Sequence, residues 1–314
     1  MLFDIDLKKM ICSVALFLTT SHVEAKFVDY IKNAPNKSPH HQIRNIDFIY
    51  MINLDQRPEK FEDCNKQLNP YGVYPYRFSA VNGWELNLDA INSVGVKYAP
   101  GMTGGFWATS FRPQDNFERH DERIKNYGQT YFAHHIAQGT IGIFLSHLSV
   151  LHDAYLSDYQ TIWVMEDDVK VLRDPTVLSD LIDRLDEKVG KDGWDILFTD
   201  QDILDANGNY VPCSGMAKKP NFNPKDKSQY TIKKDIDTNF RQIGARFGAH
   251  SMILRRSGIK MILDFIRETD IFLPYDMEYY LPIGIKMFTV LDDVVTNRPQ
   301  SSSDNGAPNY LNKE

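Results

Sequence analysis

The sequence contains only 3 cysteines, and no two of them form a CxxC pair. Zinc ribbons and thioredoxin-like dithiols need such closely spaced pairs, so the sequence argues against both classes of site. A single disulfide between Cys64 and Cys213 is one alternative. Two isolated thiols are the interpretation that we favour, because a pairing cannot be deduced from the spacing alone.

An excess of basic residues is also missing. Asp and Glu number 42 against 35 Lys and Arg, which gives a net charge of −7. Proteins that bind nucleic acid through its phosphates are usually basic or carry a basic stripe, so nucleic acid is not expected as a partner. Hydrophobic residues at 42% are typical of a globular chain, and 314 residues are enough to bury a sizeable core.

Long hydrophobic segments are absent too, so we expect no membrane-spanning helix. The apolar run at 10–18 follows two lysines and precedes Val-Glu-Ala at 23–25, an order typical of a secretory signal peptide. We therefore predict a signal peptide at 1–25 and a polar linker at 26–44. A cytoplasmic amphipathic start is the alternative, and localisation stays open between the two.

The sequence does contain an alternation of strand-like and helix-like segments. Short runs of apolar and β-favouring residues predict strands at 46–52, 76–81, 161–165, 194–199, 250–254 and 286–291. Apolar residues at helical spacing and helix-start signals predict helices at 58–68, 140–155, 174–188 and 257–267. This order predicts a single α/β domain at 45–300, with a Rossmann-type, mostly parallel sheet flanked by helices.

Three segments break the alternation. Residues 84–135 show no sustained period, and a long irregular segment inside a domain is usually functional, so we expect an acceptor region or a lid there. Residues 203–245 are polar and loop-rich. The tail at 301–314 is rich in Ser and Asn, and we expect it to be flexible.

Glu166, Asp167 and Asp168 follow the apolar strand at 161–165 directly. Neighbouring carboxylates repel one another, so one pKa would rise unless positive charge is supplied. A hard divalent ion supplies that charge and keeps positions open for phosphate oxygens. Alternate side chains of an extended segment share a side, so we expect Glu166 and Asp168 to hold the metal while Asp167 points elsewhere. A solvated acidic turn is the alternative.

Several short motifs occur in a fixed order along residues 46–300. They are Ile52-Asn-Leu-Asp-Gln-Arg-Pro-Glu-Lys60, Phe78-Ser-Ala-Val-Asn-Gly83, Gly142-Ile-Phe-Leu-Ser-His-Leu148, Met165-Glu-Asp-Asp-Val169, Trp194-Asp-Ile-Leu197 and Pro274-Tyr-Asp276. Together they resemble the signature of glycosyltransferase family 25, which includes lipooligosaccharide and collagen-modifying galactosyltransferases. Ile143 replaces the family's usual cysteine, which we interpret as packing variation. The segment 84–135 shows little that matches, so the acceptor stays open.

The resemblance implies a GT-A fold, in which the acidic motif holds Mn²⁺ or Mg²⁺ against the diphosphate of a UDP-sugar. It also implies transfer of galactose or glucose, with inversion at the anomeric carbon. The acceptor would be a hydroxyl of a glycan, a lipid-linked sugar or a protein. Peripheral contact with a membrane stays open.

An inverting displacement needs a carboxylate near the acceptor hydroxyl to take its proton. Asp276 is the first candidate, because it precedes an apparent short helix whose N-terminus would keep it ionised. Glu278 is the second candidate, and Asp200 and Asp202 are further alternatives at the end of the strand at 194–199. A plain N-cap role is the alternative for Asp276.

The donor-binding residues that the motifs imply are Asn53, Leu54, Arg57, Asn82, Gly83, Ser146, His147 and Asp167. Arg57 would either grip a phosphate with both arms of its guanidinium or lie on a helix surface. Asn82-Gly83 is also a simple turn signal. His147 lies beside an apolar stripe, where a core position competes with a role in orienting the donor or the acidic loop.

Two other classes of protein remain as alternatives. A metal-dependent hydrolase of phosphoesters or sugar nucleotides would use the same acids, usually with further ligands for a second ion. The 9 histidines show no metal-ligand spacing, so this class ranks second. The third class is an inactive sugar-nucleotide-binding relative, against which the intact acidic motif speaks.

Overall fold

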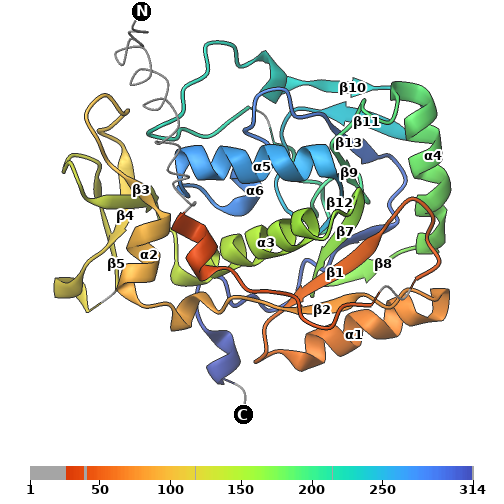
Figure 1. Ribbon diagram of the computed structural model, residues 1–314, viewed down its shortest axis with the longest axis horizontal. Coiled ribbons are helices and arrows are strands. Elements are labelled where there is room, and N and C mark those ends of the chain that lie inside the picture. Colours follow the sequence, from red (N-terminus) through yellow and green to blue (C-terminus); the bar gives the residue numbers. More distant parts are fainter. Residues whose placement is uncertain (1–25, 39–40, 117, 214, 313–314) are drawn as a thin grey trace, which may run out of the picture.

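The computed structural model describes residues 26–38, 41–116, 118–213 and 215–312 (Figure 1). The expected signal peptide at 1–25 lies outside these residues. Within the described ranges, no helix combines the length and the apolar character needed to cross a membrane. Cys64 and Cys213 are both free thiols, which confirms the interpretation of two isolated cysteines.

An eight-stranded sheet forms the centre of the molecule, in the order β10-β11-β13-β9-β12-β7-β1-β2. Its strands are β1 (Phe48–Asn53), β2 (Tyr76–Ser79), β7 (Thr161–Glu166), β9 (Ile196–Phe198), β10 (Lys233–Asp235), β11 (Phe240–Ile243), β12 (Ser251–Arg255) and β13 (Met287–Val290). Only β11 and β12 run against the direction of the others. The structure therefore confirms the predicted α/β class and the mostly parallel sheet.

Helices cover both faces of this sheet (Figure 1). They are α1 (Pro58–Leu68), α2 (Leu88–Val94), α3 (Gln138–Leu156), α4 (Leu178–Val189), α5 (Arg256–Thr269) and the single turn α6 (Tyr275–Glu278). Successive side chains of a strand point to opposite faces. Tyr50 thus joins the core under α3 and α5, while its neighbour Met51 joins the core under α1 and α4. The result is three layers with one apolar core on each side of the sheet.

Short 3-10 helices join several of these elements. They are η1 (Lys26–Tyr30), η2 (Asn69–Tyr71), η3 (Gly83–Glu85), η4 (Pro113–Asp115), η5 (Pro175–Val177), η6 (Ser228–Thr231) and η7 (Asn309–Asn312). A two-stranded sheet pairs β8 (Val169–Val171) with β14 (Val295–Asn297), directly after the acidic motif.

The segment 84–135 differs from the expected irregular insert. It contains α2 and a four-stranded sheet at one end of the molecule (Figure 1). Its strands are β3 (Val96–Lys97), β4 (Trp107–Phe111), β5 (Arg119–Arg123) and β6 (Thr130–Ala133), in the order β3-β6-β4-β5. The pattern concealed this sheet because β5 is entirely polar, so it shows no alternation of apolar residues.

The segments predicted as a linker and as a flexible tail both contact the domain in the structure. In the segment predicted as a linker at 26–44, Phe27 and Ile43 are buried, and the Lys32 ammonium donates to the Ala80 carbonyl at 2.7 Å. In the tail, Asp304 pairs with Arg57 of the first loop. Both expectations rested on polar composition, which does not reveal such contacts between distant residues.

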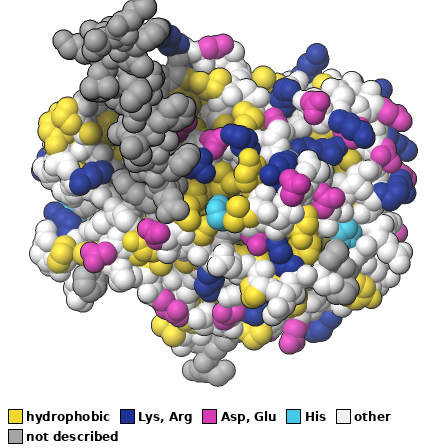
Figure 2. Space-filling model, viewed as in Figure 1, with side chains coloured by type: hydrophobic (Ala, Val, Ile, Leu, Met, Phe, Trp, Pro, Cys, Tyr) yellow, Lys and Arg dark blue, Asp and Glu magenta, His cyan; other side chains and the backbone are white. Residues whose placement is uncertain are grey.

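Charges of both signs cover the surface. On the face shown in Figure 2, Lys and Arg side chains are interspersed with Asp and Glu. On this face the two signs of charge are therefore mixed.

Candidate functional site

The acidic motif lies where the carboxyl ends of three parallel strands meet. In the sheet register Ile52 of β1 lies opposite Glu166 of β7, and Asn53 lies opposite Ser79 of β2. Open α/β sheets bind ligands at this edge, outside the carboxyl ends of their strands. Two pockets flank the motif here, and both are lined by Glu166 and Asp168.

The first pocket lies between β1, α3 and the C-terminal segment. Besides the acids, its lining includes Leu54, Lys60, Trp84 and Asp304. The second pocket lies on the α6 side of the motif, and its lining includes His250, Tyr275 and Asp276. A ligand in one pocket would therefore meet a ligand in the other at the pair of acids.

Glu166 is held by α3. The Nε2 atom of His147 lies 2.9 Å from the Glu166 carboxylate, and the imidazole stacks on the ring of Tyr275 at 4.1 Å. Burial alone would raise the pKa of Glu166, but the hydrogen bond and the charge of His147 hold it below its usual value. His147 therefore positions the Glu166 carboxylate, and its role in donor binding stays a prediction.

Asp168 is the acid whose environment most favours a cation. Its Oδ1 atom is buried and has no hydrogen-bond partner among the described residues. Burial, together with the charges of Glu166 and Asp167, raises the pKa of Asp168 to about 6. A buried carboxylate oxygen without a partner is costly, and a divalent ion would satisfy it.

Asp167 makes different contacts from its two neighbours. Its Oδ2 atom accepts a hydrogen bond from the Asn53 amide at 2.6 Å, and the Lys60 ammonium lies 3.8 Å from Oδ1. Burial raises the pKa of Asp167. It lines only the first of the two pockets. Asn53 thus fixes Asp167, and Glu166 and Asp168 remain as the pair that faces both pockets.

These residues fit a hard divalent ion. The chain offers two carboxylates on one side, one of them with an unsatisfied buried oxygen. Within the described part of the chain, these acids and a third His, Cys, Asp or Glu do not bring their ligand atoms all within 4.8 Å of one another; Asp121, His134 and His135 do so elsewhere. Mn²⁺ and Mg²⁺ sites that act on nucleotides often combine one or two carboxylates with phosphate oxygens and water.

Asp276 lies in the lining of the second pocket, with both metal-candidate acids. Its Oδ2 atom accepts a hydrogen bond from the Gly248 amide at 3.0 Å. Burial and the charge of Glu166 raise the pKa of Asp276, the opposite direction from the one expected of a helix N-terminus. The reason is that α6 has only four residues, so its dipole is small beside the effect of burial.

Glu278 is fully buried, away from both pockets. Its Oε2 atom pairs with the Lys219 ammonium at 2.6 Å, and Oε1 accepts hydrogen bonds from the amides of Phe272 and Leu273. Burial raises its pKa. Both carboxylate oxygens of Glu278 already have partners, so the structure assigns it a role in stabilising the fold and not the role of the base.

Asp200 is also committed to buried partners, namely the Arg246 guanidinium at 2.5 Å and His250 at 2.8 Å. Burial would raise the pKa of Asp200, but the Arg246 charge and the hydrogen bond with His250 hold it below its usual value. Asp202 lines a separate pocket with Arg246 and Tyr210. Of the four candidate bases, Asp276 is the one in the lining of a pocket that contains the acidic pair.

Arg57 is buried, so it does not lie on an exposed helix surface, and its contact with a donor phosphate stays a prediction. Its guanidinium forms two parallel hydrogen bonds with the Asp304 carboxylate, at 2.7 and 2.8 Å, and both side chains are 7% exposed. Because carboxylates and phosphates bind arginine in the same two-point manner, Asp304 occupies the position that a phosphate would take.

The C-terminal segment at 302–310 forms one wall of the first pocket. The Trp84 indole donates to the Asp304 carbonyl at 2.8 Å, and the Asn82 amide donates to the Tyr310 hydroxyl at 2.9 Å. Ser303, Asp304 and Asn305 line the pocket itself. Sequence reasoning missed this wall, since a Ser/Asn-rich tail carries no signal of what it contacts.

Gly83 and Ser146 hold η3 against α3. A Cβ atom on Gly83 would lie 1.9 Å from the carbonyl oxygen of Gln138, so glycine is required for this close approach. The Ser146 hydroxyl accepts the Val81 amide at 2.8 Å and donates to the Gly142 carbonyl. These residues line the first pocket and also fix its shape.

Comparison with known proteins places these features in a family. A model described as glycosyltransferase family 25 (LPS biosynthesis protein) matches residues 46–278, which is more than half of the chain. This range contains the first strand, the acidic motif and Asp276.

Curated relatives carry related names. A glycosyltransferase 25 family member of Aedes aegypti is 24% identical over 62% of this chain and 27% of its own length. Procollagen galactosyltransferase 1-B of Xenopus laevis is 22% identical over 66% of this chain and 28% of its own length. Inactive glycosyltransferase 25 family member 3 of Homo sapiens is 26% identical over 48% of this chain and 21% of its own length. The chain thus matches only about a quarter of the length of these relatives.

Proposed function

The chain belongs to glycosyltransferase family 25, and from this premise we propose that it transfers a sugar from a UDP-sugar to a hydroxyl acceptor. In this proposal Glu166 and Asp168 hold a divalent ion, Mn²⁺ or Mg²⁺. The observation that carries the proposal is the buried, unpartnered Oδ1 atom of Asp168, beside Glu166 and between two pockets.

The ion would supply Lewis-acid charge to the leaving diphosphate. The chain's own residues prepare its position. His147 fixes the Glu166 carboxylate and Asn53 holds Asp167 aside, so two of the three acids are oriented before a cation binds. Such preorganisation is worth more in a buried site than in water.

The donor nucleotide fits the first pocket best in this proposal. Leu54 and Asn82 line it, and Lys60 adds positive charge near Asp167. Arg57 reaches a donor phosphate only after Asp304 releases it. Arg57 would then exchange its two-point contact with Asp304 for a two-point contact with the donor phosphate.

Asp276 is the general base in this proposal. The acceptor hydroxyl attacks the anomeric carbon, its proton passes to the Asp276 carboxylate, and the bond from that carbon to the diphosphate oxygen breaks. UDP leaves with the electron pair, and the anomeric centre inverts. A carboxyl group whose pKa is raised towards neutrality by burial is a better base than an ordinary aspartate.

Galactose and glucose are the sugars that we propose. The name of the Xenopus laevis relative, procollagen galactosyltransferase 1-B, supports galactose and a protein acceptor. The family description, with its reference to LPS biosynthesis, supports a glycan or lipid-linked acceptor. The pocket beside Asp276 is where either acceptor would place its hydroxyl.

A panel of UDP-sugars tests the proposal. Purified protein is incubated with each donor, and UDP release is measured with Mn²⁺, with Mg²⁺ and with EDTA. We expect slow release from one donor, lost with EDTA, because water replaces the missing acceptor. Release of UMP or sugar phosphate would instead favour a sugar-nucleotide hydrolase. Metal-dependent UDP binding without turnover, even when candidate acceptors are added, would favour an inactive relative, a class to which the named human relative belongs.

A further inference from the structure

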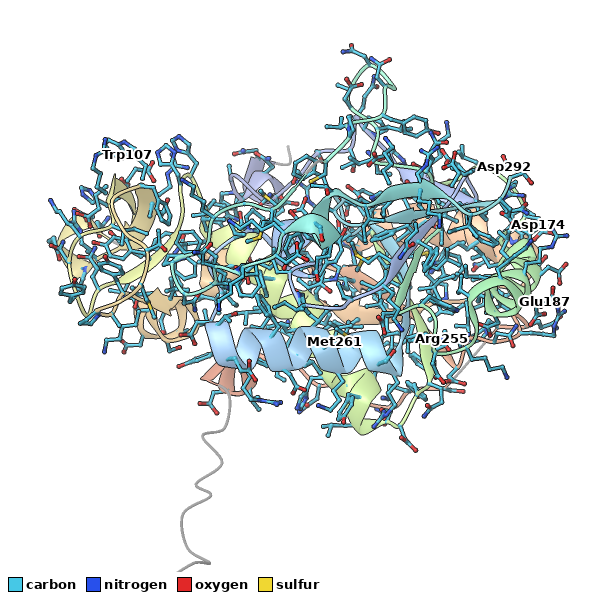
Figure 3. All side chains as sticks on the ribbon, turned by 90° about the horizontal axis from the view of Figure 1, so that it is seen from above. Trp107, Asp174, Glu187, Arg255, Met261 and Asp292 are labelled. Carbon is cyan, nitrogen blue, oxygen red and sulfur yellow. The ribbon has the colours of Figure 1, made fainter. Side chains whose placement is uncertain are left out.

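A second cluster of metal-ligand side chains lies in the four-stranded sheet, outside both pockets of the candidate active site. It consists of Asp121 on β5 and of His134 and His135, which directly follow β6. Trp107 of β4, which neighbours His134 with ring centres 5.9 Å apart, marks this end of the molecule in Figure 3. The cluster is therefore independent of the proposed transferase site.

The three side chains converge on a small volume. The Oδ2 atom of Asp121 lies 3.1 Å from Nδ1 of His135 and 3.8 Å from Nε2 of His134. All three ligand atoms lie within 4.8 Å of one another. Ligand atoms bonded to one zinc ion at about 2.0–2.2 Å are separated by distances of this order, so small side-chain rotations would close the site.

The fold brings these residues together from β5 and the end of β6, which lie on either side of β4. Asp121 lies opposite Thr109 in the register of β4 and β5, and the Thr109 hydroxyl donates to Asp121 Oδ1 at 2.6 Å. His135 has a φ of 66°, a conformation that non-glycine residues rarely adopt. The two imidazole rings lie 3.6 Å apart, centre to centre. Thr109 therefore orients one carboxylate oxygen and leaves the other towards the histidines.

The charge of the cluster also suits a cation. Asp121 brings a carboxylate to the two imidazoles. Arg119 lies 3.4 Å from the same Oδ2 atom, so it is the group that an incoming cation would displace.

We propose that Asp121, His134 and His135 form a zinc-binding site. Two imidazoles and one carboxylate are a typical ligand set for Zn²⁺, whereas Mg²⁺ and Ca²⁺ prefer oxygen ligands alone. Three protein ligands leave a fourth position for water. Both histidine side chains are accessible, 40% and 62% exposed, so the ion can enter without unfolding the sheet. The bound ion would tie β5 to the end of β6.

The test is a Zn²⁺ titration of the full chain without a histidine tag, followed by competition with a chromophoric chelator. We expect one zinc site, weakened at least about tenfold in His134→Ala and in Asp121→Asn. His120→Ala is the matched control, because it removes an exposed imidazole from the same strand and leaves the cluster intact. Circular dichroism confirms that each variant folds.

Asp168→Asn separates the two candidate metal sites. We expect this variant to keep the zinc site, because its substitution lies in the other cluster. Absorption of the Co²⁺-loaded protein adds a second readout, since imidazole ligation gives visible bands, and we expect these bands to be lost in His134→Ala. Equal zinc affinity in the wild type, His134→Ala and Asp121→Asn would overturn the proposal, as would loss of zinc in Asp168→Asn alone.

Discussion

Asp276 and Glu278 are two residues apart in the sequence, and the structure predicts opposite consequences when each loses its charge. Glu278→Gln leaves the Lys219 ammonium buried without its anionic partner, since both side chains are 0% exposed. Breaking a buried ion pair in this way typically destabilises a protein by about 3–5 kcal/mol. That is a large part of a typical unfolding free energy of about 5–15 kcal/mol.

Asp276→Asn removes a carboxylate from the pocket but leaves its structural contact in place. The new amide oxygen can still accept the hydrogen bond of the Gly248 amide, so we expect a stability loss of about 1 kcal/mol or less. Turnover should fall by about 10²–10⁴, the usual contribution of a general base.

Urea unfolding followed by circular dichroism measures the first effect, and metal-dependent UDP release measures the second. We expect Glu278→Gln to lower the urea midpoint strongly and to retain turnover per folded molecule. Asp276→Asn should retain the midpoint and lose turnover. The opposite result, an inactive Glu278→Gln with wild-type stability, would refute the assignment of these two roles.

Three further outcomes follow from single contacts. Gly142→Ala would place a Cβ atom 2.4 Å from the backbone nitrogen of Gly83. Thermal unfolding should therefore show that the free energy of unfolding falls by about 1–3 kcal/mol. Although burial opposes the ionisation of Asp200, Arg246 holds its pKa in the folded protein below the usual value. The ionised Asp200 therefore stabilises the fold above about pH 4, and this stabilisation is lost as the pH falls through the pKa of the folded state. The free energy of unfolding should therefore fall with decreasing pH at different slopes in the wild type and in Asp200→Asn below about pH 4. Equal slopes would contradict this prediction. Asp304→Ala frees the guanidinium under the C-terminal segment and should change the Kd of UDP, whereas an unchanged Kd would mean that the donor never meets that arginine.

The sequence predicted those parts of the fold whose signal is local. The helix at 58–68 begins with Pro58 and coincides with α1. The apolar run at 161–165 became β7, and the helical period from 140 became α3. In each case the apolar pattern or the start signal lies within the element itself, so no distant residue is needed to recognise it.

The sequence could not show which acids would be buried with a counter-charge. Lys219 is 59 residues from Glu278, and Arg246 is 46 residues from Asp200. Such partners are brought together only by the tertiary fold, so the sequence could not show that Glu278 and Asp200 are committed to buried partners and Asp276 is not. The same reason explains why the contact between Arg57 and Asp304, 247 residues apart, was missed.

The zinc-type cluster illustrates a further limit of spacing rules. His134 and His135 are adjacent, a spacing that matches no common zinc motif, and Asp121 lies on another strand. The strand order β6-β4-β5 and the φ of His135 bring their ligand atoms together. The polar sequence of β5 does not predict this arrangement.

The affinity for UDP with and without Mn²⁺ tests the central claim most directly, because it does not depend on an acceptor. Calorimetry would compare the wild type, Asp168→Asn and Asp174→Asn, the last being an exposed helix cap beside α4 in which asparagine is an equally good cap (Figure 3). We expect Mn²⁺ to strengthen UDP binding at least about tenfold, or 1.4 kcal/mol, in the wild type and in Asp174→Asn but not in Asp168→Asn. Equal UDP affinity with Mn²⁺ and with EDTA in the wild type, or an undiminished Mn²⁺ effect in Asp168→Asn, would contradict the account.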